Sequence, residues 1–263
     1  MSTIALSSSL ATLLATTLGF RPSVTQSPQT IAAHPGNDIV NGLRVAPSLR
    51  RFTIASLACE QDSPSTPREI GSLVEEIRLA RDSILLRVRH QTEPDGASFV
   101  DTTAYHRRTL APLWDRTYSR DWRTSWDFIG SRVTWSNQQS SQERETLDSS
   151  LDEQRFLAGM DELLIPATAR LFSGDHVTYL LLDLAQGPGE PPAFGLYTTM
   201  ARVTGSEQVA ISRDRRIDAW ILTADEAFGR YTYWIDKRSH NVVMWQTPEY
   251  ESLCPMKYIS SSP

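Results

Sequence analysis

Residues 217–246 read IDAWILTADEAFGRYTYWIDKRSHNVVMWQ. Three short runs of aromatic and β-branched residues cover 217–223, 230–235 and 242–246, and turn-forming residues separate them. Such side chains suit a pleated, half-buried surface, and short strands at even spacing are typical of an antiparallel meander. This stretch therefore predicts three consecutive antiparallel strands.

Similar runs extend from this meander toward the N-terminus. Strands are predicted over 99–106, 110–118, 176–184, 194–203 and 207–211, and a hairpin over 122–137 around Gly130. A turn is expected at Thr204-Gly205. Residues 70–90 fit either one helix or two strands by periodicity alone, so that alternative stays open.

One segment has the spacing of a helix. Its apolar residues fall on one helical face: Leu147, Leu151, Phe156, Leu157, Met160, Leu163 and Leu164. Ser150 and Glu153 have capping-box spacing, and Pro166 is expected to end the helix. We predict a mainly β (α+β) chain with one helix near 147–165.

Length and composition suggest a single domain. The chain has 263 residues with 40% hydrophobic and 22% charged residues, which is ordinary for a globular protein. We expect a β domain over 38–250, followed by a loose tail at 251–263. Residues 1–37 are predicted to hold a signal-like apolar segment and a disordered linker, although no Lys or Arg precedes the apolar residues.

The net charge and the cysteine spacing indicate which kinds of partner and metal site the chain lacks the residues for. A formal net charge of -5 with no long basic run argues against nucleic-acid binding. The two cysteines, Cys59 and Cys254, lack zinc-site spacing, so they are either a disulfide or two thiols. We expect no metal and no cofactor, because phosphate-loop, nucleophile-elbow and H-E-x-x-H motifs are absent.

The sequence assigns no catalytic residue. The five histidines show no shared helix face or alternating strand positions. His106, His176, Asp101 and Asp183 are the residues that an enzyme would be expected to point into a pocket, but a structural role suits each of them as well.

Aromatic residues are the main candidates for ligand binding. Nearly all lie in predicted strands, where one face of a curved sheet could line an apolar pocket, and ordinary core packing is the alternative. The candidates are Trp126, Trp135, Tyr197, Trp220, Tyr233, Trp234 and Trp245.

The order of several short motifs resembles that of exported bacterial β-proteins of the LolA/LolB-like (lipoprotein carrier-like) superfamily, most of whose members are uncharacterised. The motifs are Val203 to Val209, Asp218-Ala219-Trp220-Ile221-Leu222, Tyr231 to Lys237, and Val242-Val243-Met244, with Val100-Asp101-Thr102-Thr103 and Thr109-Leu110-Ala111-Pro112 upstream. The resemblance covers about residues 68–247. It implies a curved antiparallel sheet, a partly closed barrel packed on one helix, and two strands over 70–90.

These observations lead to three functional hypotheses. The first is a non-catalytic, extracytoplasmic (periplasmic or secreted) binding or carrier protein with an apolar concavity for a lipid-like or other hydrophobic ligand. The second is an isomerase, cyclase or hydrolase acting on a small hydrophobic substrate in the same cavity. The third is a structural envelope protein with no ligand. No transmembrane span is expected in the mature chain.

Overall fold

One large curved sheet dominates the computed structural model, which describes residues 28–57, 68–93, 95–140, 142–185, 192–212, 214–226, 229–248 and 254–261. The first nine strands are β1 (Thr30–Ala33), β2 (Ser48–Ser56), β3 (Arg68–Arg81), β4 (Ile84–Thr92), β5 (Ser98–His106), β6 (Pro112–Ser119), β7 (Trp122–Ile129), β8 (Arg132–Gln139) and β9 (Glu145–Ser150). The remaining strands are β10 (Phe156–Leu157), β11 (His176–Ala185), β12 (Ala193–Ala210), β13 (Arg216–Glu226), β14 (Gly229–Asp236), β15 (Val242–Gln246) and β16 (Met256–Ser260).

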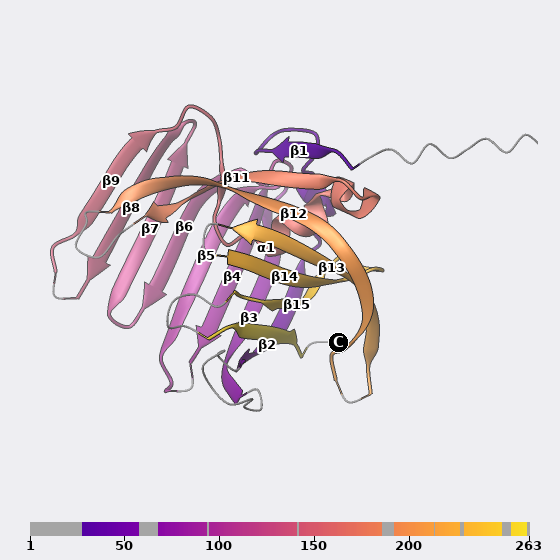
Figure 1. Ribbon diagram of the computed structural model, residues 1–263. Helices are drawn as coiled ribbons and strands as arrows, with labels where there is room; N and C mark the ends of the chain where they lie inside the picture. Colours follow the sequence, from indigo (N-terminus) through magenta and orange to yellow (C-terminus); the bar gives the residue numbers. More distant parts are fainter. Residues whose placement is uncertain are drawn as a thin grey trace, which may run out of the picture.

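The strand order shows how the sheet wraps. It runs β1-β11-β12-β13-β14-β15-β16-β2-β3-β4-β5-β6-β7-β8-β9, with β10 beside β11. All pairings are antiparallel except β1–β11 and β10–β11. Figure 1 shows β2–β9 and β11–β15 as two layers that cross, with β1 and β9 as separate edges, so the barrel-like sheet is not closed. The predicted fold class is confirmed.

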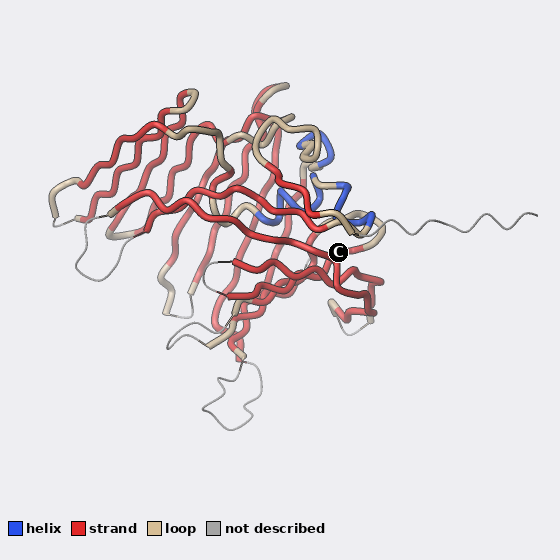
Figure 2. The backbone as a smooth tube through the Cα atoms, turned by 45° about the horizontal axis from the view of Figure 1, so that its top comes forward, coloured by secondary structure: helices blue, strands red, loops and turns tan. Residues whose placement is uncertain are grey.

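The space between the layers holds α1 (Asp161–Ala167), all of whose residues are buried. The short helices η1 (Gly42–Arg44) and η2 (Ala169–Ser173) lie near α1 on one side of the molecule (Figure 2). The main core joins side chains from both layers to this helix, and a smaller cluster lies around Val209, Ala219, Trp234 and Met244.

The prediction of two strands over residues 70–90 is confirmed by β3 and β4, and the hairpin around Gly130 by β7 and β8. Gly130 has a φ of 62°, a left-handed conformation that glycine adopts without steric cost. The expected turn at Thr204-Gly205 is wrong, because β12 continues through it with a register shift between Val203 and Gly205.

The predicted helix near 147–165 is wrong for most of its length. Leu147 belongs to β9, opposite Trp135 of β8, while β10 pairs with β11. Gly159 then takes a φ of 71°, which no right-handed helix contains, so α1 begins only at Asp161. The apolar residues that matched a helical face are therefore divided among two strands, a helix of seven residues and the segments between them, which hold Leu151 and Met160.

The folded part of the chain extends beyond the predicted bounds of 38–250 at both ends. Residues 30–33 form β1 rather than linker, while residues 1–27, which hold the predicted signal-like segment and the first part of the predicted linker, lie outside the described residues. The expected loose tail contains β16, which pairs with β15 on one side and β2 on the other. Tyr258 of β16 is buried and stacks on Trp245, with ring centroids 4.3 Å apart.

Of the two states expected for the cysteines, a disulfide or free thiols, the structure gives the first for Cys254. Cys59 is the other cysteine of the sequence and lies outside the described residues. Among the described residues, no helix is both long and apolar enough to span a membrane.

Candidate functional site

Three tryptophans line a cleft between the β7–β8 hairpin and the end of β11. Trp126 and Trp135 are directly opposite each other in the hairpin, with ring centroids 6.5 Å apart in an edge-on arrangement. Trp122 lies on the same face and is 37% exposed. The cleft has a volume of about 410 Å³, and it is also lined by Thr124, Asn137, Gln139, Asp183 and Leu184.

The alternation of the two strands explains why these side chains meet. Successive strand residues point to opposite faces, so Trp122, Thr124 and Trp126 share one face of β7. Their direct partners on β8 are Gln139, Asn137 and Trp135. Cross-strand aromatic pairs stabilise a hairpin by roughly 0.2–1 kcal/mol.

The second layer provides the opposite wall of the cleft. Phe194 of β12 contacts Trp126, with ring centroids 5.7 Å apart. Leu184 and Asp183 come from β11, directly opposite Phe194 and Gly195. The face of β7 and β8 that carries the tryptophans is therefore the inner face of the curved sheet.

Asp183 gives the apolar cleft a polar end. Its Oδ1 accepts a hydrogen bond of 2.7 Å from the backbone N–H of Leu184. Burial raises the pKa of this carboxyl, while hydrogen bonds from Leu184 and the Tyr197 side chain oppose that rise. With Asn137 and Gln139, the cleft therefore combines aromatic surface with a few hydrogen-bonding groups.

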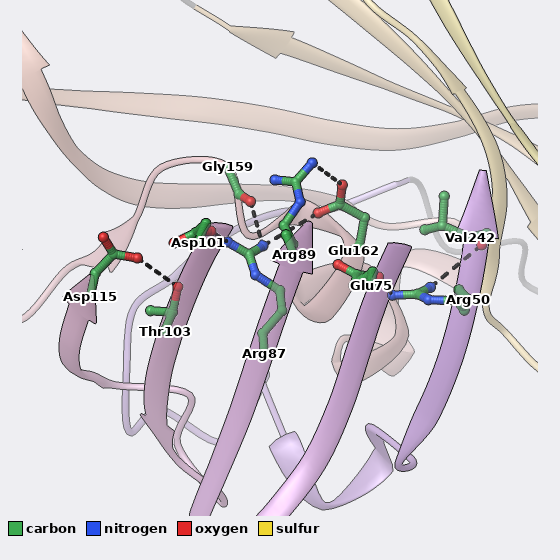
Figure 3. Close-up of polar contacts among 10 residues, drawn as sticks. All are labelled: Arg50, Glu75, Arg87, Arg89, Asp101, Thr103, Asp115, Gly159, Glu162 and Val242. Atoms are coloured by element: carbon green, nitrogen blue, oxygen red, sulfur yellow. Dashed lines mark hydrogen bonds and ion pairs between the residues drawn. The ribbon is translucent and has the colours of Figure 1, made fainter. Parts of the chain in front are cut away.

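A buried network of charged side chains lies deeper between the layers (Figure 3). Arg87 of β4 is at its centre, where Nη1 donates to the carbonyl of Gly159 at 2.6 Å and lies 3.6 Å from Glu162 of α1. Its Nη2 donates to Asp101 of β5 at 3.4 Å, and Arg89 lies 3.9 Å from Glu162. These contacts connect α1 to β4 and β5.

A second buried ion pair joins Arg50 of β2 to Glu75 of β3. Arg50 also donates to the carbonyl of Val242 in β15 at 3.5 Å. Burial favours a neutral Glu75, but the positive charges of Arg50, Arg89 and Arg87 outweigh it and hold the pKa of Glu75 below its usual value. Glu75 is therefore an ionised partner for these arginines.

The pKa of Asp115 in β6 is raised, whereas that of Glu75 is lowered. Its Oδ2 accepts a hydrogen bond of 2.7 Å from Thr103 Oγ1. Burial, followed by the neighbouring Asp101 carboxyl, raises the pKa of Asp115 to about 8. Around neutral pH this carboxyl is mostly protonated, so two neighbouring acids can be buried without two negative charges.

The acids near α1 extend the network toward the cleft. Burial, with Glu162 as the next cause, raises the pKa of Asp161 to about 6. Burial and the charges of Asp161, Glu162 and Asp183 raise the pKa of Glu226 to about 9. Tyr233 forms a hydrogen bond with Asp161. Asp183 is the member of this electrostatic group that lines the cleft.

The interior network is closed to large molecules. Arg87 is 2% exposed and Asp115 5% exposed, and neither lines the tryptophan cleft. Within the described part of the chain, no three His, Cys, Asp or Glu residues are arranged to hold a metal ion. The network is suited to fixing α1 against the strands.

The structure separates the aromatic residues that the sequence suggested. Trp126 and Trp135 meet in the cleft, and Tyr197 lies near it through Asp183. Trp220 lies under the Lys237 ammonium group, Tyr233 is in the interior, Trp234 belongs to the smaller apolar cluster, and Trp245 packs edge-on against Phe52. Ligand binding by these residues stays a prediction.

The candidate enzyme residues are also dispersed. His106 is the last residue of β5, with Nδ1 3.1 Å from Thr109 Oγ1, and His176 begins β11. Asp101 belongs to the buried network, so of these four Asp183 alone lines the cleft.

Sequence reasoning missed several residues of the site. Trp122, Asn137 and Gln139 join the cleft because β7 and β8 pair in a specific register, and alternation from Trp126 and Trp135 would have found them. The arginine–carboxylate pairs carried a weaker signal, namely charged residues at inward positions of otherwise apolar strands.

Comparisons with known proteins inform the fold alone. No family model matches the chain, and no curated protein matches it. The chain is similar in structure to a β-barrel-like protein of a domain of unknown function (DUF1849) from Brucella abortus, known from its crystal structure. It has 12% sequence identity and a TM-score of 0.52, and the match covers 83% of this chain and 97% of that one. A barrel-like fold is supported, while membership of the LolA/LolB-like superfamily stays a prediction.

Proposed function

We propose that this protein is a non-catalytic, extracytoplasmic binding protein whose tryptophan cleft holds a lipid-like or other hydrophobic ligand. The cross-strand pair of Trp126 and Trp135 carries the proposal, because these buried rings form the apolar floor of the cleft beside the more exposed ring of Trp122. Binding sites for small molecules are typically concave and mostly apolar, with a few placed polar groups.

The polar residues suggest how such a ligand would be oriented. Its hydrocarbon part would lie against Trp122, Trp126 and Trp135, and its polar end would meet Asp183 and Asn137. Tryptophan suits this task because its large ring buries much area with few rotatable bonds. The ligand would therefore be amphipathic, with one hydrogen-bonding end.

A non-catalytic role fits the ionisable groups of the cleft better than an enzymatic one. Asp183 is the one acid or base among the described residues that line it. Acid–base and nucleophilic mechanisms generally need a second positioned group. The other acids with raised pKa, Asp115, Asp161 and Glu226, lie in the interior network.

Cys254 supports an extracytoplasmic location. It is disulfide-bonded, and disulfides persist mainly in oxidising compartments outside the cytoplasm.

A brominated fatty acid provides a direct test, because bromine quenches tryptophan fluorescence on contact. We expect saturable quenching of the full chain by dibromostearate. Trp122→Ala should weaken binding about tenfold, which corresponds to about 1.4 kcal/mol, because this exposed ring can be removed without opening the core.

Trp220→Ala is the matched control, since Trp220 lies on β13 away from the lining residues of the cleft. It should bind the fatty acid like the unmodified chain. Equal weakening by the two substitutions, or quenching that never saturates, would reject the tryptophan cleft as the ligand site.

A further inference from the structure

A second pocket opens on the other face of the β6–β8 region. It has a volume of about 250 Å³ and is lined by Arg116, Tyr118, Arg123, Thr124, Ser125, Ser136, Gln138 and Arg144. We refer to it as the arginine pocket. The segment leading into β9 contributes Arg144, and the other lining residues come from β6, β7 and β8.

Strand alternation places this pocket on the outside of the sheet. Trp126 faces inward, because its ring contacts Phe194 of the opposite layer. Ser125 immediately precedes Trp126 in β7 and therefore points outward, as does Arg123 two residues before Ser125. The arginine pocket and the tryptophan cleft are thus on opposite faces of the same hairpin.

Neutral contacts hold the side chains of the pocket in place. The Nε of Arg123 donates to Gln138 Oε1 at 3.1 Å. Arg144 Nη2 donates to Ser136 Oγ at 2.9 Å, and Ser136 Oγ is 2.7 Å from Ser125 Oγ. Arg123 is therefore held by an amide oxygen and Arg144 by a hydroxyl oxygen, and neither of these contacts is made by a carboxylate.

The charge of the pocket is positive. Arg116 is neutralised by an ion pair with Asp127. Within the described part of the chain, Arg123 and Arg144 have no such ion pair. A guanidinium group has five N–H donors, so both arginines keep donors beyond the contacts described above. This local excess contrasts with a formal net charge of -5 for the chain.

We propose that the arginine pocket binds a phosphate monoester group. The planar donor fork of arginine matches two phosphate oxygens at once, and serine hydroxyls add further donors. The volume of the pocket accommodates one phosphate with a small substituent, and its wall offers one aromatic ring, that of Tyr118. The group can be a free small phosphate or a lipid headgroup.

Titration of the full chain with inorganic phosphate and methyl phosphate at low salt, followed by calorimetry, tests the site. We expect saturable binding that weakens at least about tenfold in the Arg123→Gln/Arg144→Gln double variant, since two charge-assisted contacts are lost. Arg81→Gln is the control for a lost surface charge, because Arg81 is exposed at the end of β3 and the substitution removes one positive charge outside the pocket. It should bind phosphate like the unmodified chain.

Flotation with phosphatidylcholine vesicles, with and without phosphatidic acid, distinguishes a lipid headgroup from a free small phosphate as the source of the bound group. Binding that needs phosphatidic acid and is lost in the double variant identifies a lipid headgroup, whereas phosphate binding without flotation identifies a soluble ligand. Arg144→Lys keeps the charge but loses the fork, so it should weaken binding while leaving the thermal midpoint unchanged. The proposal is overturned if the unmodified chain shows no saturable phosphate binding, or if Arg81→Gln weakens it as much as the double variant does.

Discussion

At the scale of single residues, the inner face of this sheet carries several ionisable side chains among the apolar ones. Strand positions that face inward carry Arg50, Glu75, Arg87 and Asp115, all less than 10% exposed. Buried charges are tolerated when they are paired or when a raised pKa keeps them neutral, and both solutions occur here. Glu75 is ionised beside arginines, while Asp115 keeps its proton beside another acid.

The raised pKa of Asp115 predicts how stability depends on pH. Its usual pKa is 3.8, and the folded chain raises it to about 8. Between these values the folded chain keeps a proton that the unfolded chain has lost. The free energy of unfolding should therefore fall as the pH rises, by up to about 1.4 kcal/mol per pH unit from this group.

Asp115→Asn tests this dependence, because an amide cannot ionise and its oxygen can still accept from Thr103. Urea unfolding at pH 5 and pH 8 should give a smaller loss of stability for this variant than for the unmodified chain. Asp148→Asn, at an exposed position on β9, should leave the loss unchanged. Equal losses in all three proteins would contradict the assignment to Asp115.

At the scale of elements, α1 depends on ion pairs as well as on apolar packing. Its Glu162 and the preceding Gly159 carbonyl both contact Arg87 of β4. Arg87→Met should lower the free energy of unfolding by about 3 kcal/mol or more, since the substitution leaves buried carboxylates without their cation. Chemical denaturation measures this loss.

Two further variants distinguish the effect of breaking a buried ion pair from the effect of removing any arginine side chain. Arg87→Met/Glu162→Gln should recover part of the stability, because the unpaired charge on α1 is removed. Arg132→Met breaks the exposed pair with Asp148 and should leave the free energy of unfolding nearly unchanged, because water screens an exposed ion pair. A loss from Arg87→Met no larger than this would show that the buried network contributes little.

Strand β16 shows what sequence patterns can and cannot reveal about elements. The β7–β8 hairpin was predictable, because period and turn residues are local signals, whereas periodicity alone left β3 and β4 open between two strands and one helix. The five residues of β16 have a central place because β15 flanks them on one side and the distant β2 on the other, and that information is absent from their local sequence. The same limit applies to the cleft, where Trp126 and Trp135 were predicted but their contact with Phe194 required the fold.

Deletion of residues 256–263 should therefore abolish cooperative unfolding, although these residues end the chain. The deletion leaves β15 and β2 without their shared neighbour and exposes Trp245, on which Tyr258 stacks. Thermal melts followed by circular dichroism would measure this effect. Deletion of 262–263 spares β16 and should leave the melt unchanged, whereas a cooperative melt of the longer deletion would contradict the central role of β16.

At the scale of the whole molecule, β16 is where the two layers join. In the sheet order it lies between β15, the end of the β11–β15 layer, and β2, the start of the β2–β9 layer. Its last strand residue, Ser260, is opposite Phe52, so the C-terminal part of the chain pairs with an early strand. Contacts so far apart in sequence carry a high entropic cost in folding, which a covalent link between distant segments reduces.

The disulfide at Cys254 has the position of such a link, because it lies directly before Pro255 and β16. Reduction should lower the free energy of unfolding by about 2–4 kcal/mol, since the unfolded chain regains conformational freedom. Urea titrations with and without reductant would measure the change, and Cys254→Ser should be equally unstable in both. Alkylation of the denatured, unreduced chain should add no label, because Cys254 and Cys59 are its two cysteines. Labelling before reduction, or identical stability with and without reductant, would show that the layers are held by β16 pairing alone.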